Sequence, residues 1–338
     1  MIVAAFLCLF NIIFDSHFTL KQIIISSVVG IFLLMASLPI RNFEILYLFC
    51  LVWGCRNLNN DRVIKFVTQI VFVMIIMIAL LAVFGVVEAS VRSTNVTRQR
   101  YDFGYGSWAI LPLQYTTLAL FLLYLKKRKL RLREILLLVI IGCVICIAAD
   151  VKTGVIVLVV GTIGLYICDR ITIKKWERLY ILLVIPQIFT VGSYILVKMY
   201  ATGQYGVLER LNNALNNRLM YPVRGLEAYG IQLLSNPNYM TVYSDAGYFG
   251  IDNSYLYMLV AWGILATVVL CGLYSYVIFY CVREKNLRLL FITLLLLGNA
   301  LLWNRVLVLI DYQIIICFSD AFRTKKNCER KHKNNEMV

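Results

Sequence analysis

The chain has 338 residues, 61% of them apolar, and a formal charge of +15 at pH 7. Soluble globular chains are nearer to about 45–50% apolar, so a composition with long apolar runs excludes an ordinary soluble domain. Most Lys and Arg residues lie between the apolar runs, where the topology of a membrane protein accounts for them, so we expect no nucleic-acid partner.

The apolar runs predict an all-α, polytopic membrane protein with about 10–12 transmembrane helices, because a spanning helix needs about 20 mainly apolar residues. Residues 1–338 are expected to form a single transmembrane domain. The candidate spans are 1–14, 22–40, 43–55, 63–87, 108–125, 135–150, 153–168, 179–199, 254–282, 287–303 and 306–319.

Short basic segments predict the orientation, because Lys and Arg accumulate in cytoplasmic loops. Residues 126–133, 169–178 and 283–288 are such segments, and 320–338 form a basic cytoplasmic tail. Two candidate spans separate each neighbouring pair, so all four fall on one side. The segments 88–107 and 200–253 and the turns at 150–153 and 304–305 then lie on the outer side.

The large outer loop at 200–253 has a helical pattern of its own. Its apolar residues recur at the spacing of an amphipathic helix, which predicts two short helices at the membrane surface. Pro222 lacks an N–H and is expected to separate them. The apolar positions are Leu208, Leu211, Leu215, Leu219 and Leu226. The Asn side chains expected to face water or sugar are Asn212, Asn213, Asn216 and Asn217.

The outer side is rich in cations. Arginine forks suit phosphate and pyrophosphate, although each cation could also contact lipid headgroups. Lys152 could instead pair with Asp150, and Arg305 could extend to the membrane surface. The outer cations considered as site residues are Arg100, Lys152, Arg210, Arg218, Arg224 and Arg305.

Asp252 precedes the apolar run that begins near Tyr255. It could be a helix cap or a general base. No metal or cofactor is expected, because His17 and His332 lie outside the large loop and the Cys143/Cys146 pair is interpreted as helix packing.

Several segments resemble Wzy-type capsular and exopolysaccharide repeat-unit polymerases, in the O-antigen polymerase and ligase group. Residues 215–219, 225–231, 251–257 and 262–264 resemble the outer loop and following helix of that family. Residues 100–104 resemble its first outer loop.

The resemblance implies an inverting glycosyltransferase that joins undecaprenyl-pyrophosphate-linked repeat units at the outer face of the bacterial cytoplasmic membrane. It implies pyrophosphate binding by Arg218 and Arg100, supported by Arg224 and Lys152. Asp252 would be a base or a sugar ligand. Asn253, Tyr229 and Tyr255 would shape the acceptor site. The implied partners are membrane lipids, a flippase and chain-length regulator proteins.

Three alternatives remain open at this point. A ligase-like glycan transferase is expected to use an outer-loop His, which this loop lacks. A flippase or transporter for lipid-linked oligosaccharides would carry buried charges in several spans. A membrane scaffold would need no site.

Overall fold

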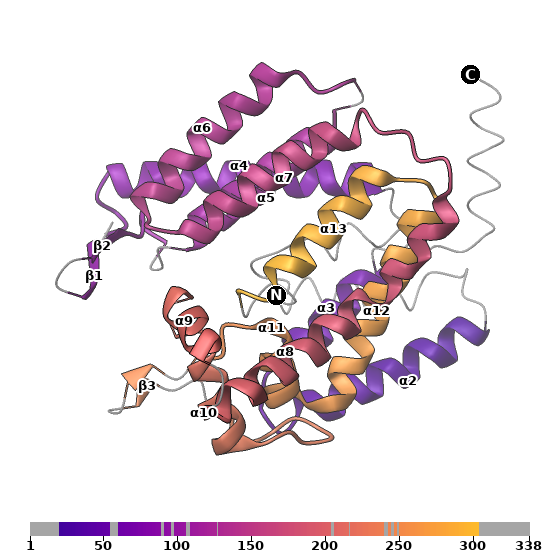
Figure 1. The fold of residues 1–338 in the computed structure, drawn as a ribbon. Helices are drawn as coiled ribbons and strands as arrows, with labels where there is room; N and C mark the ends of the chain where they lie inside the picture. Colours follow the sequence, from indigo (N-terminus) through magenta and orange to yellow (C-terminus); the bar gives the residue numbers. More distant parts are fainter. Residues whose placement is uncertain are drawn as a thin grey trace.

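The computed structural model describes residues 20–54, 60–88, 91–95, 98–105, 109–126, 128–203, 206–215, 217–239, 243–244, 247–248 and 250–303. It is mostly helical, with two short hairpins (Figure 1). The elements in chain order are α2 (Leu20–Ser37), α3 (Glu44–Gly54), α4 (Asn60–Val83), β1 (Val91–Asn95), β2 (Arg98–Tyr101), α5 (Ile110–Tyr124), α6 (Leu132–Ala148), α7 (Lys152–Cys168), the 3-10 helix η1 (Trp176–Val184), α8 (Ile185–Ala201), α9 (Gly206–Ala214), α10 (Met220–Tyr229), β3 (Tyr243–Ser244), β4 (Gly247–Tyr248), α11 (Ser254–Tyr257), the π-helix η2 (Met258–Trp262), α12 (Gly263–Arg283) and α13 (Leu287–Asn299).

The predominance of helix confirms the prediction from the apolar runs, since each candidate span within the described residues coincides with a helix. By length and composition, three helical stretches of the described chain could cross a membrane: Asp61–Val83, Trp176–Ala201 and Ser254–Arg283. Further apolar helices are shorter. The candidate spans 1–14 and 306–319, the side chain of Arg305 and the tail 320–338 lie outside the described residues.

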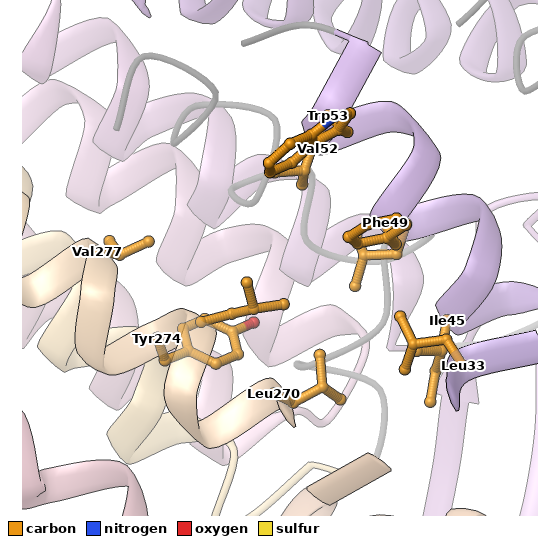
Figure 2. Close-up of a pocket in the computed structure, with 10 residues that line it drawn as sticks. Leu33, Ile45, Phe49, Val52, Trp53, Leu270, Tyr274 and Val277 are labelled. Atoms are coloured by element: carbon orange, nitrogen blue, oxygen red, sulfur yellow. The ribbon is translucent and has the colours of Figure 1, made fainter. Parts of the chain in front are cut away.

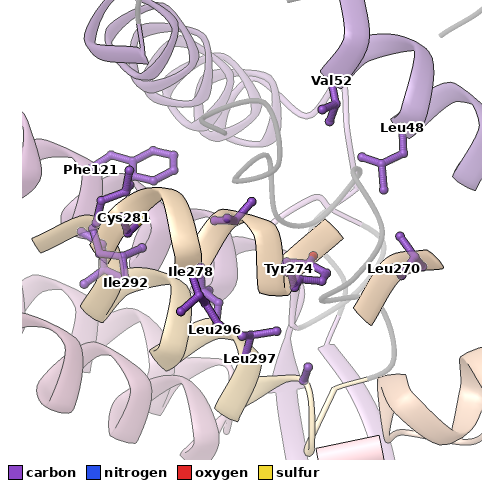
Figure 3. Packing of buried hydrophobic residues seen from close by; sticks show 14 of the residues in the cluster. Leu48, Val52, Phe121, Leu270, Tyr274, Ile278, Cys281, Ile292, Leu296 and Leu297 are labelled. Carbon is purple, nitrogen blue, oxygen red and sulfur yellow. The ribbon is translucent and has the colours of Figure 1, made fainter. Parts of the chain in front are cut away.

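The helices form two groups (Figure 1). In one group α5 packs against α4 and α7, and α6 packs against α7; in the other α12 packs against η1, α2 and α8. Helix α13 contacts both α7 and α12, and so joins the groups. Figure 3 shows Phe121, Cys281 and Ile292 meeting in the apolar core that results. Burial of such side chains away from water or lipid headgroups fixes the relative positions of the helix ends.

A small apolar cavity lies between α2, α3 and α12 (Figure 2). Phe49 and Trp53 line it from α3, and Leu270 and Tyr274 line it from α12. Its lining contains no charged side chain. The acid–base and anion-binding chemistry of the described chain must therefore be sought at the helix ends.

Three of the basic segments meet at one end of the molecule. The Asp169 carboxylate accepts a hydrogen bond from the Leu130 backbone N–H at 2.8 Å and from Arg288 Nε at 2.6 Å. Arg288 Nη1 donates to the Lys126 carbonyl at 2.5 Å. These contacts join the loops after α5, α7 and α12, which the sequence predicted to share a side.

The predicted span at 254–282 is interrupted. Helix α11 runs into the π-helix η2, and Gly263 at φ +82° precedes the regular helix α12. The backbone N–H groups of Ile264 and Leu265 donate to the Gln232 and Leu233 carbonyls at 3.0 and 3.1 Å. A Cβ at Gly263 would lie 2.3 Å from the Leu234 carbonyl oxygen, so only glycine allows the loop to approach this closely.

The large loop contains two short helices as predicted, α9 and α10, but the predicted break at Pro222 is wrong. Pro222 lies in the first turn of α10, where an N–H has no helical partner and proline is tolerated. The chain turns at Asn217, whose φ is +64°. Asn212 is buried rather than facing water, and its side-chain oxygen accepts from the Leu219 and Met220 N–H groups at 3.0 and 3.1 Å.

Candidate functional site: two arginine–aspartate pairs

Two of the segments predicted to lie on the outer side, the first (88–107) and the large loop, meet at the end of α13. Trp303 and Phe103 both pack against the buried cluster of Ala109, Ala149 and Val151, the last two of which flank Asp150. On the other side, the Arg218 Nη1 group donates to the Leu302 carbonyl at 2.6 Å. Figure 1 shows β1, β2, α9 and α10 on the same side of the molecule. The segment 300–303 thus lies between the first outer segment and the large loop.

Arg218 also pairs with Asp252. Its Nε lies 3.4 Å from Asp252 Oδ2, and the two side chains are 22% and 29% exposed. The guanidinium therefore contacts a backbone carbonyl and a carboxylate at once, while both partners remain accessible to a ligand. Arg218 precedes the buried Leu219, and Asp252 follows the buried Ile251. Because Leu219 and Ile251 pack in one cluster, they bring the two charged neighbours together.

The environment of Asp252 acts on its pKa in two directions. Burial raises the pKa of the Asp252 carboxyl above its ordinary value, and the Arg218 charge opposes this increase. A carboxyl group whose pKa has been raised by burial is a stronger base once ionised, which is the property required of a general base.

Asn253, and not Asp252, caps the helix. The Asn253 side-chain oxygen accepts from the Tyr255 and Leu256 N–H groups at 3.0 and 3.1 Å. Its Nδ2 donates to Ser193 Oγ on α8 at 2.9 Å. The alternative of Asp252 as a plain cap is therefore wrong, and its carboxylate is left to Arg218.

The second pair joins the first outer segment to the turn after α6. Arg100 Nε lies 3.5 Å from Asp150 Oδ2, and both side chains are partly buried. Asp150 has φ +51°, a conformation that Asp adopts more readily than most residues. The ion pair expected between Asp150 and Lys152 is replaced by this one, and Lys152 is exposed at the start of α7.

Hydrogen bonds from the start of α11 fix the position of the segment 300–303. The Ser254 backbone N–H donates to the Ala300 carbonyl at 2.8 Å, and Ser254 Oγ donates to the Trp303 carbonyl. Together with the bond from Arg218 to Leu302, these contacts attach the end of α13 to the large loop. The Arg218–Asp252 pair is therefore bonded to this segment, and Trp303 of the same segment packs beside the turn that carries Asp150.

The remaining predicted residues either make other contacts or are exposed. Tyr255 is buried in the core, where its hydroxyl donates to the Leu297 carbonyl at 2.9 Å, so it does not line an open acceptor site. Tyr229 is half-buried against Tyr239, with their ring centroids 5.2 Å apart. Arg210 and Arg224 are exposed on α9 and α10.

Two of the contact partners could not be predicted from the residue pattern. The Leu302 carbonyl is a backbone group, so the identity of the residue does not indicate its contact with Arg218. Ser193 lies within an apolar run, 60 residues before Asn253. Asp150, in contrast, had a signal: a carboxylate in a short turn between two apolar runs is costly unless paired.

The arrangement suits anion binding coupled to proton acceptance. Two guanidinium groups provide positive charge and several N–H donors, and Asp252 provides a carboxylate beside one of them. Among the residues that the structure describes, no group of three or more His, Cys, Asp or Glu side chains could hold a metal ion.

Comparison of the chain with known proteins gives no further identification: no family model, no curated protein and no solved structure matches it.

Proposed function

We propose that the chain is a polytopic membrane glycosyltransferase that polymerises oligosaccharide repeat units carried on undecaprenyl pyrophosphate. It would act at the outer face of the bacterial cytoplasmic membrane. The observation that carries the proposal is the partly exposed Arg218–Asp252 pair, attached through 300–303 to the region of Arg100 and Asp150. The sequence resemblance to Wzy-type polymerases supports the same function.

The surface of the helices supports a membrane location. On α4 the side chains of Phe66, Phe72 and Met77 are 63%, 50% and 54% exposed. A soluble monomer rarely exposes a continuous apolar face of this kind, whereas lipid makes it favourable.

The distribution of charge supports the proposed orientation. The loops that carry Lys126, Asp169 and Arg288 meet at one end, and their excess of Lys and Arg is typical of the cytoplasmic side. Figure 1 shows these loops far from β1, β2 and α9. The two arginine–aspartate pairs would then face outward, where flipped lipid-linked repeat units are available.

The proposed reaction transfers the growing chain from its lipid pyrophosphate to the acceptor repeat unit. The acceptor hydroxyl oxygen forms a bond to the anomeric carbon, and the bond from that carbon to the pyrophosphate oxygen breaks. The hydroxyl proton passes to the Asp252 carboxylate, and the bonding electron pair leaves with the pyrophosphate. Arg218 and Arg100 stabilise the negative charge that develops there. Attack opposite the leaving group inverts the anomeric configuration.

The test is an Arg218→Ala strain in which the surface and lipid-linked glycans are analysed by size. A polymerase defect leaves single repeat units on lipid or at the surface. Arg283→Ala serves as the matched control, because Arg283 is exposed at the opposite end and pairs with its neighbour Glu284. Full-length polymer in the Arg218→Ala strain would contradict the proposal.

The same strain separates the alternatives. Accumulation of repeat units on the inner leaflet would identify a flippase. Polymer that is made but not attached to its final acceptor would identify a ligase-like transferase.

A further inference from the structure

The Asp252 carboxylate is used for contact with Arg218 and not for helix capping. Asn253 already accepts from the N–H groups of Tyr255 and Leu256, so the start of α11 does not depend on Asp252. Within the described chain, the ion pair of Asp252 is with Arg218. The carboxylate can therefore move or change partner without loss of the helix.

Among the residues that the structure describes, the Arg218 guanidinium donates a hydrogen bond through Nη1 and forms its ion pair through Nε. Nη1 donates to the Leu302 carbonyl, which fixes the position of the group. The edge formed by Nε and Nη2 remains as the edge that can donate two parallel hydrogen bonds. Asp252 Oδ2 lies 3.4 Å from Nε, so the carboxylate lies beside that edge.

A phosphate group binds arginine best at such a two-donor edge. A phosphate at Arg218 and the contact with Asp252 therefore exclude each other. The distance of 3.4 Å is longer than a strong charged hydrogen bond, so Asp252 is held weakly and can be replaced by a phosphate that accepts two hydrogen bonds from Arg218.

We propose that a phosphate oxyanion of the substrate displaces Asp252 from Arg218, and that this exchange frees the carboxylate to accept the proton of the acceptor hydroxyl. This inference rests on the proposed function for the identity of the substrate. The phosphate binds Arg218 first, and its binding releases the Asp252 carboxylate to act as the base. Removal of the acceptor proton therefore depends on bound donor pyrophosphate.

The physical reason lies in the balance of effects on Asp252. Burial raises its pKa and the Arg218 charge opposes that increase. When phosphate neutralises the guanidinium, the opposition weakens and the carboxylate becomes more basic. Before exchange, the Arg218 charge makes the carboxylate a weaker proton acceptor than burial alone would make it.

The test is binding of inorganic pyrophosphate to the full chain in phosphatidylcholine nanodiscs, measured by calorimetry at constant pH and salt. Asp252→Asn removes the competing charge, and pyrophosphate should bind about fivefold tighter than to the wild type. Arg218→Ala should abolish this gain in the double variant. Glu284→Gln, which breaks an exposed pair at the opposite end, should leave the affinity unchanged.

Unchanged or weaker pyrophosphate binding by Asp252→Asn would overturn the exchange. Asp252→Ser, which also removes the charge, provides a second measurement if the first variant folds poorly. Replacement of phosphatidylcholine by phosphatidylglycerol distinguishes the source of the phosphate. If lipid headgroups occupy Arg218, the anionic lipid should reduce pyrophosphate binding, and more strongly in Asp252→Asn than in the wild type.

The outcome is separable from that of the proposed function. Tighter binding by Asp252→Asn together with normal polymer in an Arg218→Ala strain would retain the exchange and remove the polymerase. Single repeat units in the Arg218→Ala strain, together with unchanged pyrophosphate binding by Asp252→Asn, would retain the polymerase and remove the exchange.

Discussion

Arg218 is the side chain on which the candidate site depends, because it contacts the Leu302 carbonyl and the Asp252 carboxylate with different nitrogens. Lysine at this position would keep the charge but could not reproduce the planar, forked arrangement of donors. The chemistry of a guanidinium, and not only its charge, is what the two contacts use.

We predict that Arg218→Lys reduces glycan transfer about tenfold or more, since one hydrogen bond to a charged group contributes about 1.5–3 kcal/mol. The measurement is transfer between purified lipid-linked repeat units by membranes with equal amounts of each variant. Arg218→Ala should lose more than Arg218→Lys. Equal rates for the wild type and the Lys variant would show that a positive charge alone is sufficient.

We predict that ionisation of Asp252 destabilises the folded chain. Burial raises its folded pKa above the ordinary 3.8, so the folded state binds this proton more tightly than the unfolded state. Stability contributed by the protonated group is therefore present in acid and is lost as the pH rises from 3.8 through the raised value. The wild type should unfold at the same temperature as Asp252→Asn in acid and at a lower temperature at neutral pH.

Thermal unfolding in detergent at several pH values checks this prediction. Glu284→Gln is the control for a general effect of removing one negative charge. A wild type that gains stability relative to Asp252→Asn with rising pH would show that Arg218 outweighs burial.

The sequence shows which residues of the predicted outer segments carry charge, but it does not show which residues they contact. Asp252 and Asn253 are adjacent and both are common caps, so residue type could not decide which accepts the helix N–H groups. Asn212 was expected to face water or sugar because it lies off the apolar stripe of the helical pattern. Its burial depends on the loop 217–220 folding back over it, a contact that no local pattern encodes.

At the scale of elements, the junction between η2 and α12 is the most constrained. Gly263 combines positive φ with a close approach of the Leu234 carbonyl. We predict that Gly263→Ala destabilises the chain by about 1–3 kcal/mol or more, because the backbone conformation is strained for alanine and the new Cβ meets backbone. Thermal unfolding and proteolysis of the large loop provide the measurement.

Gly272→Ala is the matched control for that substitution. Gly272 lies in the interior of the same helix, and a Cβ there meets nothing within 4 Å. Alanine should stabilise α12 by about 0.5–1 kcal/mol there. Similar effects of the two substitutions would contradict a special role for the junction.

The apolar runs predicted where helices exist and missed where they break. A run of apolar residues has the same composition whether its helix is regular or contains a π-turn, so 254–282 appeared continuous. The helix break was predicted at Pro222, although proline fits the first turn of a helix. The actual turn depends on Asn217 in a left-handed conformation, which Asn permits but does not require.

At the scale of the whole molecule, the two ends differ in their charge networks. One end joins basic loops through Asp169 and Arg288, and the other carries the two arginine–aspartate pairs. We predict that alkaline phosphatase, which is active only outside the cytoplasm, is active when fused after Arg210 and inactive when fused after Arg128 or Lys285. Activity after both Arg128 and Arg210 would contradict the proposed orientation.

Much of the helical framework could be predicted, because each apolar run needs only its own residues to form a helix. The relative position of the runs could not, because it depends on contacts between distant residues. Arg218 and Leu302 are 84 residues apart, and Leu130 and Asp169 are 39 residues apart. That the basic segments 126–133, 169–178 and 283–288 share one end was predictable, since their charge and the two spans between neighbours indicate it.

The hydrogen bonds across the junction at Gly263 also make it possible to measure movement of the large loop. The amides of Ile264 and Leu265 belong to a helix, yet they donate to carbonyls of residues 232 and 233. Their deuterium exchange therefore follows detachment of that loop segment and not the fraying of α12. A ligand that holds the loop in place slows the deuterium exchange of these two amides relative to their helical neighbours. The exchange of the two amides therefore reports on ligand occupancy at Arg218.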